Sequence, residues 1–447
     1  MATAEWIRPL MLYLPIAAAG GAWALRRPGP RLRAGVLLSA AWCLVTLAAL
    51  HAVAQRAGWW SFPVRGGLFL GMPVEALVGW VVLWGVALPL VLPRIHPLPA
   101  VLAAGWLDLM LMPLCAPVLR LGRDWWVGEA VALGACLLPA LLLARWTAED
   151  RRLYPRAAMQ AVLSGGLVLW LIPSAVFAQV GGGWGTLLGR PLSATLAWAQ
   201  ILAFAALPGL SATQEFATRG GGTPIPYDPP RRLVHSGPYA YVANPMQLSA
   251  ALTLTLWGGL LGSGWVMLGG AMTVCYSAGL AAWDEDADLT ARFGTRWAEY
   301  RGAVRPWLPR WRPYRPEDLP PAKLYVAAEC GPCAQVGAWM TRRGARGLAV
   351  VPAEAHPARD LRRITYDPAD GGTEQEGVAA LARALEHVHA GWALAAMALR
   401  LPGVTQTVQV LVDASGGGPR LVRRWSVGGS DAAACAVPAA GVGMDAG

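Results

Sequence analysis

The chain has 447 residues, of which 55% are hydrophobic and only 14% charged, and its formal net charge is +10. So apolar a composition excludes an ordinary soluble protein and is typical of a polytopic membrane protein. A basic chain can bind nucleic acid, but here the arginines cluster in short loops between apolar runs, where they orient membrane helices. We therefore expect the lipid bilayer as a partner and no nucleic acid.

Apolar runs dominate the first half of the chain. A membrane-spanning helix needs roughly 17 to 25 mostly apolar residues. Runs of this length occur at 9–25, 35–55, 74–92, 98–119, 126–144, 158–180 and 192–210. A further block, 246–282, is broken by glycines and indicates two helices joined by a tight turn. The prediction is a polytopic α-helical membrane protein with about nine membrane helices, the last two forming a hairpin.

The loops between these runs predict an orientation. With the N-terminus outside, the inside loops carry Arg94 and the arginine clusters at 26–33, 145–156 and 219–232, whereas the outside loops carry isolated arginines. Positively charged loops remain on the cytoplasmic side. We therefore expect a multi-pass inner-membrane protein in which the chain after residue 282 is cytoplasmic.

One acid lies inside an apolar run. Asp108 is near the middle of the fourth run, where an ionisable group is costly and is a functional candidate by default. It could equally hydrogen-bond a neighbouring helix. The sequence does not name its partner, so Asp108 stays outside the candidate sites.

Composition changes after the last apolar block. The prolines of 306–323 cannot continue a helix and indicate a stiff linker. Residues 324–420 suggest a small soluble α/β unit, and the Gly/Ala-rich end suggests disorder. The predicted parts are N-terminal membrane helices (1–212), a helix-hairpin core (213–312), a linker (313–322), an α/β domain (323–425) and a disordered tail (426–447).

The segment GPYAYVANPMQL, residues 237–248, places aromatic and polar residues at the start of the hairpin. Its Gly-Pro pair starts a turn, and Pro245 suits the first turn of a helix. Because a hairpin returns the chain to its starting side, the acids of 284–288 should come back beside this turn. These acids either form a binding site or simply complement the dipole of a solvated helix start.

Together, the two segments resemble the integral-membrane methyltransferases of the isoprenylcysteine carboxyl methyltransferase and phospholipid methyltransferase type. The resemblance covers about 233–309 and rests on GPYAYVANPMQL and on the later pattern ED-x2-L-x3-FG-x2-W-x2-Y-x6-WLP. It implies S-adenosylmethionine at the cytoplasmic end of the hairpin and a lipid-soluble acceptor, isoprenoid or carboxyl, entering from the bilayer. The cofactor-binding residues it implies are Gly237, Tyr239, Tyr241, Asn244, Pro245, Glu285 and Asp286. Glu285 would pair with the cofactor's amine, and Arg301 or Arg305 would attract an anionic acceptor.

The segment departs from the family pattern at three positions. Ala243, Asn244 and Gln247 stand where the family has arginine, histidine and tyrosine. Asn244 can donate and accept hydrogen bonds but cannot be charged. Two interpretations follow: an active methyltransferase, or a methyltransferase-like core that has lapsed and now anchors the C-terminal domain.

The segment LYVAAECGPC, residues 324–333, indicates a strand that leads into a helix. A C-x2-C pair in this position is a thioredoxin-like signal: the helix dipole stabilises a Cys330 thiolate, and Cys333 is the resolving thiol. The later segment EGVAALARALE resembles the DCC family of thiol-disulfide oxidoreductases. The implied partner is a protein or small-molecule disulfide.

Zinc binding is the alternative use of the two cysteines. His356, His387 and His389 are available as further ligands, but the chain has no second C-x2-C. We expect no metal, and we expect Glu386, His387 and His389 on a solvated helix face.

The leading prediction is thus a membrane S-adenosylmethionine-dependent methyltransferase with an appended thiol-disulfide oxidoreductase domain. In that prediction the candidate catalytic residues are Glu285, Arg301, Cys330 and Cys333. The alternative is an anchored oxidoreductase, and a third class is a binding or scaffold protein.

Overall fold

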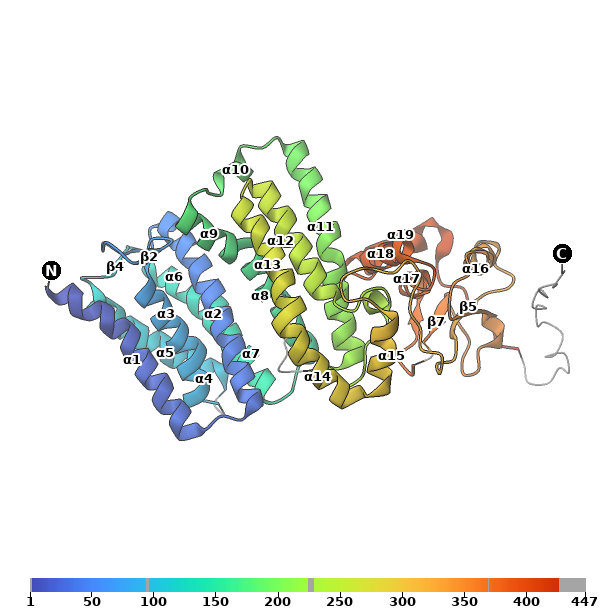
Figure 1. Cartoon of the computed structure of the whole chain (residues 1–447), viewed down its shortest axis with the longest axis horizontal. Helices are drawn as coiled ribbons and strands as arrows, with labels where there is room; N and C mark the ends of the chain where they lie inside the picture. The colour runs from blue at the N-terminus through green and yellow to red at the C-terminus, as the bar shows by residue number, and fades with distance from the viewer. Residues whose placement is uncertain (1, 94–95, 224–228, 369, 426–447) are drawn as a thin grey trace. The chain divides into compact units, whose positions relative to one another are not determined.

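In a computed structural model the chain is mostly helical and divides into two compact units, Met1–Arg310 and Trp311–Gly447 (Figure 1). Each unit is described by itself. The described residues are 2–93, 96–223, 229–368 and 370–425, of which 2–5, 188 and 280–284 are described by their backbone alone. Arg94 and the expected disordered tail, 426–447, lie outside the described residues.

Helices build the first unit. They are α1 (Ala2–Arg26), α2 (Pro30–Ala57), α3 (Val74–Val82), α4 (Leu88–Val91), α5 (Pro97–Leu111), α6 (Trp125–Val131), α7 (Leu138–Ala148), α8 (Leu153–Gly166), α9 (Ile172–Val180), α10 (Gly185–Leu188), α11 (Leu192–Glu215), α12 (Pro245–Leu261), α13 (Gly264–Tyr276), α14 (Ala282–Phe293) and α15 (Thr295–Ala303). Three short strands, β1 (Trp60–Ser61), β2 (Leu68–Phe69) and β3 (Met72–Pro73), lie between α2 and α3, and β4 (Arg120–Leu121) precedes α6.

Widened π-helical turns join several of these helices into longer ones. Pro89, Pro139 and Pro173 each stand at the start of the α-helical segment that follows such a turn. Proline has no N–H to donate, and its ring clashes with the carbonyl one turn earlier. A local widening of the helix accommodates both effects. The pairs α3–α4, α6–α7 and α8–α9 therefore continue as membrane-length helices through their prolines.

Within the described residues, six helices are long and apolar enough to cross a membrane. They are Pro30–Ala57, Val74–Val91, Pro97–Cys115, Trp125–Ala148, Leu153–Val180 and Leu192–Gly220. Large apolar side chains cover their outer surfaces; Leu102 and Trp106 of α5 are 72% and 61% exposed. Such surfaces fit a lipid environment. The other three expected spans coincide with α1, α12 and α13, which are helices outside this set of six.

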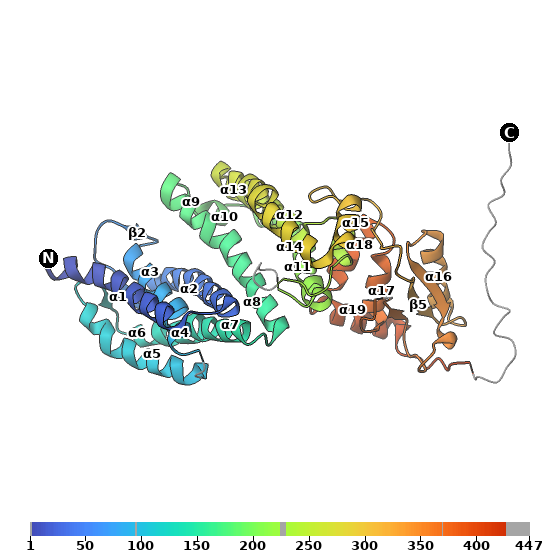
Figure 2. The ribbon, with the colours of Figure 1, turned by 60° about the horizontal axis from the view of Figure 1, so that its bottom comes forward.

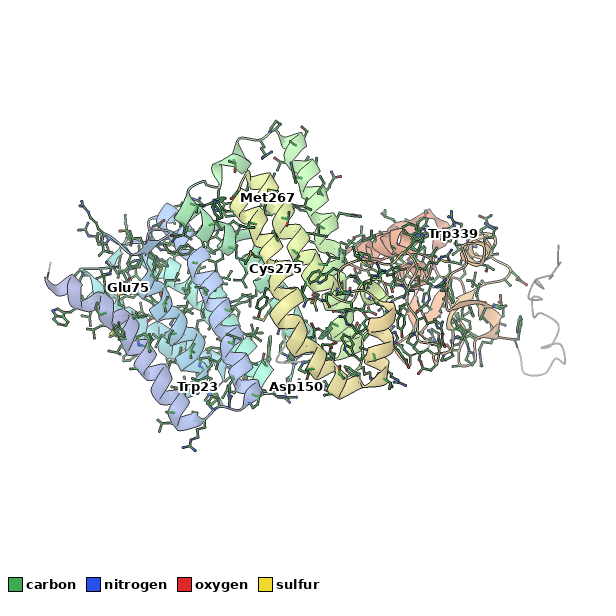
Figure 3. All side chains as sticks on the ribbon, viewed as in Figure 1. Trp23, Glu75, Asp150, Met267, Cys275 and Trp339 are labelled. Carbon is green, nitrogen blue, oxygen red and sulfur yellow. The ribbon has the colours of Figure 1, made fainter. Side chains whose placement is uncertain are left out.

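The arginine-rich loops meet at one end of the first unit. Asp150, in the loop between α7 and α8, forms ion pairs with Arg31 at 2.9 Å and with Arg231 at 2.5 Å. Arg26, at the end of α1, donates to the carbonyl of Val91 at 2.9 Å. Asp150 is labelled at the lower end of this unit in Figure 3. Four loops that the orientation prediction assigns to one side thus contact one another.

The predicted hairpin is formed by α12 and α13. Gly262 ends α12 with a φ of +67°, a left-handed conformation that glycine adopts without strain. Ser263 then caps α13 by accepting a hydrogen bond from the N–H of Val266 at 3.4 Å. Helices α11, α12 and α13 lie side by side (Figures 1 and 2). The hairpin returns the chain to the end at which α12 begins.

The second unit contains a four-stranded sheet in the order β6-β5-β7-β8. Its strands are β5 (Ala322–Val326), β6 (Leu348–Pro352), β7 (Thr365–Asp367) and β8 (Gln375–Glu376), and its helices are α16 (Gly331–Arg342), α17 (Gly377–Leu385), α18 (Ala390–Leu399) and α19 (Val404–Val412). β5 pairs parallel with β6 across α16 and antiparallel with β7, which pairs antiparallel with β8. Leu324 and Tyr325 of the central strand β5 are both buried, as expected for a strand covered on both faces.

Candidate functional site

The segment 237–248 forms a tight turn followed by the start of α12. Gly237 opens a 3-10 turn, η6 (Gly237–Ala240), with a φ of +58°. A Cβ added at this glycine would lie 3.3 Å from the Cγ and Cδ atoms of Glu215, which belongs to α11. Glycine is therefore required here by its backbone conformation and by the approach of an acidic side chain.

Replacing Gly237 with alanine should destabilise the first unit by about 1–2 kcal/mol, because a left-handed residue with a Cβ is strained. Thermal unfolding of the purified full-length protein in nanodiscs would detect this as a lower midpoint. Gly264→Ala is the matched control, since this glycine lies in a helix and a Cβ there would meet nothing within 4 Å. Equal midpoints for the two variants would contradict the prediction.

The chain that follows the hairpin is hydrogen-bonded to this turn. The Tyr300 hydroxyl donates to the carbonyl of Tyr239 at 2.8 Å. The N–H of Ala243 donates to the carbonyl of Arg305 at 3.0 Å, and the N–H of Asn244 donates to that of Pro306 at 3.2 Å. The two segments that carry the family resemblance are thus adjacent in space.

Two of the expected site residues, Glu285 and Arg301, lie near each other beside the start of α12. Glu285 of α14 lies within hydrogen-bonding reach of Gln247 and within electrostatic reach of Arg301. The Glu285 side chain is partly exposed to solvent. Desolvation of its carboxyl by neighbouring groups raises the pKa of Glu285, and the hydrogen bond with Gln247 and the charge of Arg301 partly offset this rise. The Arg301 guanidinium lies 5.5 Å from the ring centre of Trp297. Its Nη1 atom is buried and has no hydrogen-bond partner among the described residues.

Other expected site residues make structural contacts. Asp286 accepts a hydrogen bond from the indole N–H of Trp297 at 2.8 Å. Tyr241 and Pro245 are buried, and the carbonyl of Tyr241 accepts from the N–H of Arg310 at 2.9 Å. Asn244 precedes α12, but its side chain does not cap the helix. These residues hold the turn in place, whereas Glu285, Arg301 and Tyr239 present side-chain polar groups.

Glu215 is a site residue that the sequence analysis did not identify. It is fully buried, and the Ser236 hydroxyl donates to its carboxylate at 2.5 Å. Arg219 lies 3.9 Å from the same carboxylate. The sequence does contain a signal for this residue: Glu215 is an acid at the end of a long apolar helix, where ionisable groups are rare.

The Tyr239 hydroxyl lies within electrostatic reach of both Glu285 and Glu215. It is buried and has no hydrogen-bond partner among the described residues. Burial raises the pKa of Tyr239 well above its usual value, and the nearby Glu285 and Glu215 contribute to the same effect. Tyr239 is therefore a neutral donor without an acceptor, an uncommon state for a buried polar group.

A second candidate site is the cysteine pair. Cys330 precedes α16 at the N-cap position, and its Sγ lies 2.7 Å from that of Cys333. The hydrogen bond from Cys333 lowers the pKa of Cys330, and the positive charge of Arg420 lowers it further. Burial raises the pKa of Cys333 to about 11. Cys330 is therefore the more readily ionised of the two thiols.

Glu354 supports the loop that leads to Cys330 and was not identified from the sequence. Its Oε1 accepts a hydrogen bond from the N–H of Ala328 at 3.2 Å. Its Oε2 is buried without a hydrogen-bond partner among the described residues. No local pattern marks this glutamate, because the contact joins two loops at the ends of β5 and β6.

The three histidines considered as zinc ligands have other contacts. His356 lies 3.1 Å from Glu374, and His387 lies 3.0 Å from the Tyr366 hydroxyl. His389 caps α18 and stacks on an indole ring. Within the described part of the chain, no group of three or more His, Cys, Asp or Glu residues could hold a metal ion.

The prediction of a solvated helix face at Glu386 was wrong. Glu386 is buried and forms ion pairs with Arg383 at 3.1 Å and with Arg400 at 2.6 Å. The Glu386 carboxylate therefore joins Arg383 and Arg400 inside the domain through two buried ion pairs. Sequence spacing did not reveal it, because Arg400 lies beyond the next helix.

Asp108 has a partner in the first unit, the carboxyl group of Glu129 on α6. Both residues are buried, and the two groups interact electrostatically. One oxygen of Asp108 and both oxygens of Glu129 have no hydrogen-bond partner among the described residues. The pair joins α5 to α6 and lies outside both candidate sites.

Comparison of the chain with protein-family models, with curated proteins and with solved structures found no match. The geometry of the two sites and the motifs that they contain are therefore the guide to the function of this chain.

Proposed function

We propose that the protein is a membrane methyltransferase that uses S-adenosylmethionine and acts on a lipid-soluble acceptor, with an appended thiol-disulfide oxidoreductase domain. The observation that carries the first part is the site formed by segment 237–248 and α14. There Glu285, the Tyr239 hydroxyl and the Arg301 guanidinium come together, and two of these groups have buried donors without partners.

These residues fit a ligand that is charged and that offers several hydrogen-bond acceptors. Glu285 would hold an ammonium group, and the unpartnered donors of Tyr239 and Arg301 would each find an acceptor in a bound molecule. The Arg301 guanidinium is a cationic donor that partly offsets the absence of an arginine at Ala243 and of a histidine at Asn244. The fit supports a cofactor pocket over a solvated helix start.

S-adenosylmethionine supplies a methyl group bound to a positively charged sulfur. A lone pair of the acceptor forms the new bond to the methyl carbon while the carbon–sulfur bond breaks and its electron pair remains on sulfur. Such a transfer mainly requires alignment of the two reactants. In this proposal Glu285 orients the cofactor's amine, and Arg301 attracts an anionic acceptor that enters from the bilayer.

The membrane arrangement belongs to the same proposal. Nine membrane helices, including α1 and the α12–α13 hairpin, would place the arginine-rich end of the first unit in the cytoplasm by the positive-inside rule. The protein would then lie in the inner membrane with its C-terminal domain cytoplasmic. The contacts of Asp150 with Arg31 and Arg231, which gather the basic loops at one end, support this orientation.

A test of the methyltransferase proposal is equilibrium binding of labelled S-adenosylmethionine to the full-length protein in nanodiscs. We expect saturable binding that S-adenosylhomocysteine displaces. A protein that folds normally but shows no saturable binding would overturn the proposal and leave the anchored oxidoreductase as the better description.

The second activity is supported by the order of strands and by the cysteines. A β-α-β unit followed by an antiparallel β-hairpin, in the order β6-β5-β7-β8, is the arrangement of a thioredoxin-like domain. Cys330 stands at the N-terminus of the first helix, where the dipole favours a thiolate. Attack of this thiolate on a disulfide would form a mixed disulfide, which Cys333 would resolve.

Arg420 should contribute to the reactivity of Cys330. Its positive charge lowers the pKa of the thiol, so Arg420→Ala should raise that pKa and reduce the thiolate fraction near neutral pH. We expect alkylation by iodoacetamide to slow by about threefold or less, because exposed charges interact weakly in water. The rate measured against pH should shift to higher pH. Arg423→Ala, an exposed neighbour, is the control, and identical profiles for the two variants would contradict the role of Arg420.

A further inference from the structure

A basic cavity lies at the arginine-rich end of the first unit. Its volume is about 520 Å³, and its walls come from the start of α5, the end of α7 and the loop after α7. The polar and aromatic residues of the lining are His96, Arg145, Trp146, Glu149, Arg151 and Arg152. The three arginines exceed the single glutamate, which leaves a surplus of two positive charges with His96 neutral.

The backbone of the loop between α7 and α8 separates its acidic side chain from its basic ones. Asp150 and Arg152 have φ values of +52° and +54°, a left-handed conformation that is strained for residues other than glycine. Asp150 pairs with Arg31, Arg156 and Arg231 and therefore neutralises arginines outside the cavity. The loop thus separates the charges, with the acid facing other basic loops and its two neighbouring arginines lining the cavity.

The single acid of this lining, Glu149, pairs with two of its three arginines. Glu149 pairs with Arg145 at 2.9 Å and lies 3.7 Å from Arg151, whose side chain is 73% exposed. Arg152 forms no ion pair with any described residue. A bound anion would therefore meet at least one guanidinium that is free to pair with it.

An apolar groove adjoins the cavity. It shares Pro97 and Arg145 with the cavity and continues between α2, α4, α5 and α7. The groove has a volume of about 30 Å³, which is too small for a hydrocarbon chain, and the rest of its lining is apolar: Leu32, Pro89, Leu92, Pro93, Ala100, Leu141, Ala144 and Ala148. A basic cavity at the arginine-rich end of apolar, membrane-length helices matches a molecule with a charged head in the cavity and a hydrocarbon chain that stays in the bilayer.

We propose that this cavity binds the phosphate headgroup of an anionic glycerophospholipid, whose acyl chains remain in the surrounding bilayer. Arginine pairs with phosphate through two parallel hydrogen bonds, and basic pockets between membrane helices recognise anionic lipid headgroups. Trp146 lines the cavity, and an indole suits the membrane interface. This site is independent of the methyltransferase and redox sites.

The test uses the full-length protein in nanodiscs made of equal parts phosphatidylcholine and phosphatidylglycerol. Lipids that stay bound after detergent extraction are quantified by mass spectrometry. Wild type should retain phosphatidylglycerol preferentially. The double variant Arg151→Gln, Arg152→Gln should lose this preference by about tenfold, since each basic residue near a membrane surface contributes appreciably to anionic lipid binding.

The matched control removes two arginines elsewhere. Arg120 and Arg123 lie between α5 and α6, and Arg120 belongs to β4, which pairs with β1 beyond the other end of α2. Arg120→Gln, Arg123→Gln should keep the lipid preference. The proposal is overturned by equal loss in both double variants or by an unchanged preference in Arg151→Gln, Arg152→Gln. Full displacement of phosphatidylglycerol by millimolar inorganic phosphate would also overturn it, because the site would then bind free phosphate and not a lipid.

Discussion

Glu285→Ala should lower the affinity for S-adenosylmethionine by at least about tenfold, because a charge-assisted hydrogen bond contributes roughly 1.5–3 kcal/mol. The carboxylate is the one acidic group near Gln247 and Arg301 that the described part of α14 directs toward the turn at 237–248. Equilibrium binding of labelled cofactor to the protein in nanodiscs measures the change.

The matched control for this variant lies on the same helix. Asp288 is exposed and pairs with Arg292 one turn farther along, at 2.8 Å. Asp288→Ala removes the same charge from α14 but should leave cofactor affinity within about twofold, as surface ion pairs contribute little. If both variants bind like wild type, Glu285 does not hold the cofactor.

The pH dependence of binding gives a second measure of the same interaction. Desolvation by neighbouring groups raises the pKa of Glu285, so its carboxyl becomes protonated at a higher pH than an ordinary glutamate. Only the ionised form pairs with an ammonium group, and affinity should therefore fall as the pH falls through this raised pKa. The stability of the ligand-free protein depends on pH in the opposite direction. Because the pKa of Glu285 is raised in the folded state, ionisation of this carboxyl lowers the free energy of unfolding as the pH rises. Affinity in Glu285→Gln should show no such step.

Cys330→Ser should abolish the reduction of small disulfides and of insulin by the full-length protein, because the thiolate of Cys330 is the expected nucleophile. Dithiothreitol would regenerate the dithiol in this assay. Cys333→Ser should behave differently: the first attack proceeds, and a mixed disulfide on Cys330 accumulates that mass spectrometry detects.

Cys275 supplies the control for the redox prediction. It is an exposed cysteine of α13, distant in sequence from the pair, and Cys275→Ser should keep full activity. Unchanged disulfide reduction in Cys330→Ser would show that the CGPC pair is not the redox centre. Full turnover in Cys333→Ser would show that Cys333 is not the resolving thiol.

Local patterns were enough to locate the helices and the turn motifs. Long apolar runs produced helices at all the expected positions, and the glycines after Leu261 ended α12 where the break was expected. The proline-containing runs were also located correctly, although their π-helical turns were not foreseen. The length of an apolar run and the position of a glycine affect structure close to them in the sequence. The helices and the break between α12 and α13 could therefore be predicted from the sequence alone.

Contacts between distant segments account for what the sequence analysis missed. Glu215 joins the site because α11 packs beside the turn that contains Gly237, and Glu354 supports Ala328 across two strands. The error at Glu386 has the same origin, since its partner Arg400 lies just after the end of the next helix, α18. Residue spacing within one segment does not predict such pairings.

The sequence by itself therefore determined the membrane class, the hairpin, the distribution of basic loops and the position of the cysteine pair, because each depends on residues that are near one another along the chain. Only the tertiary structure decided which polar groups face one another. It placed Glu215 and Glu285 around the Tyr239 hydroxyl and gathered Arg145, Arg151 and Arg152 around one cavity. The physical reason is that burial and electrostatic pairing depend on how helices pack, which no single segment specifies.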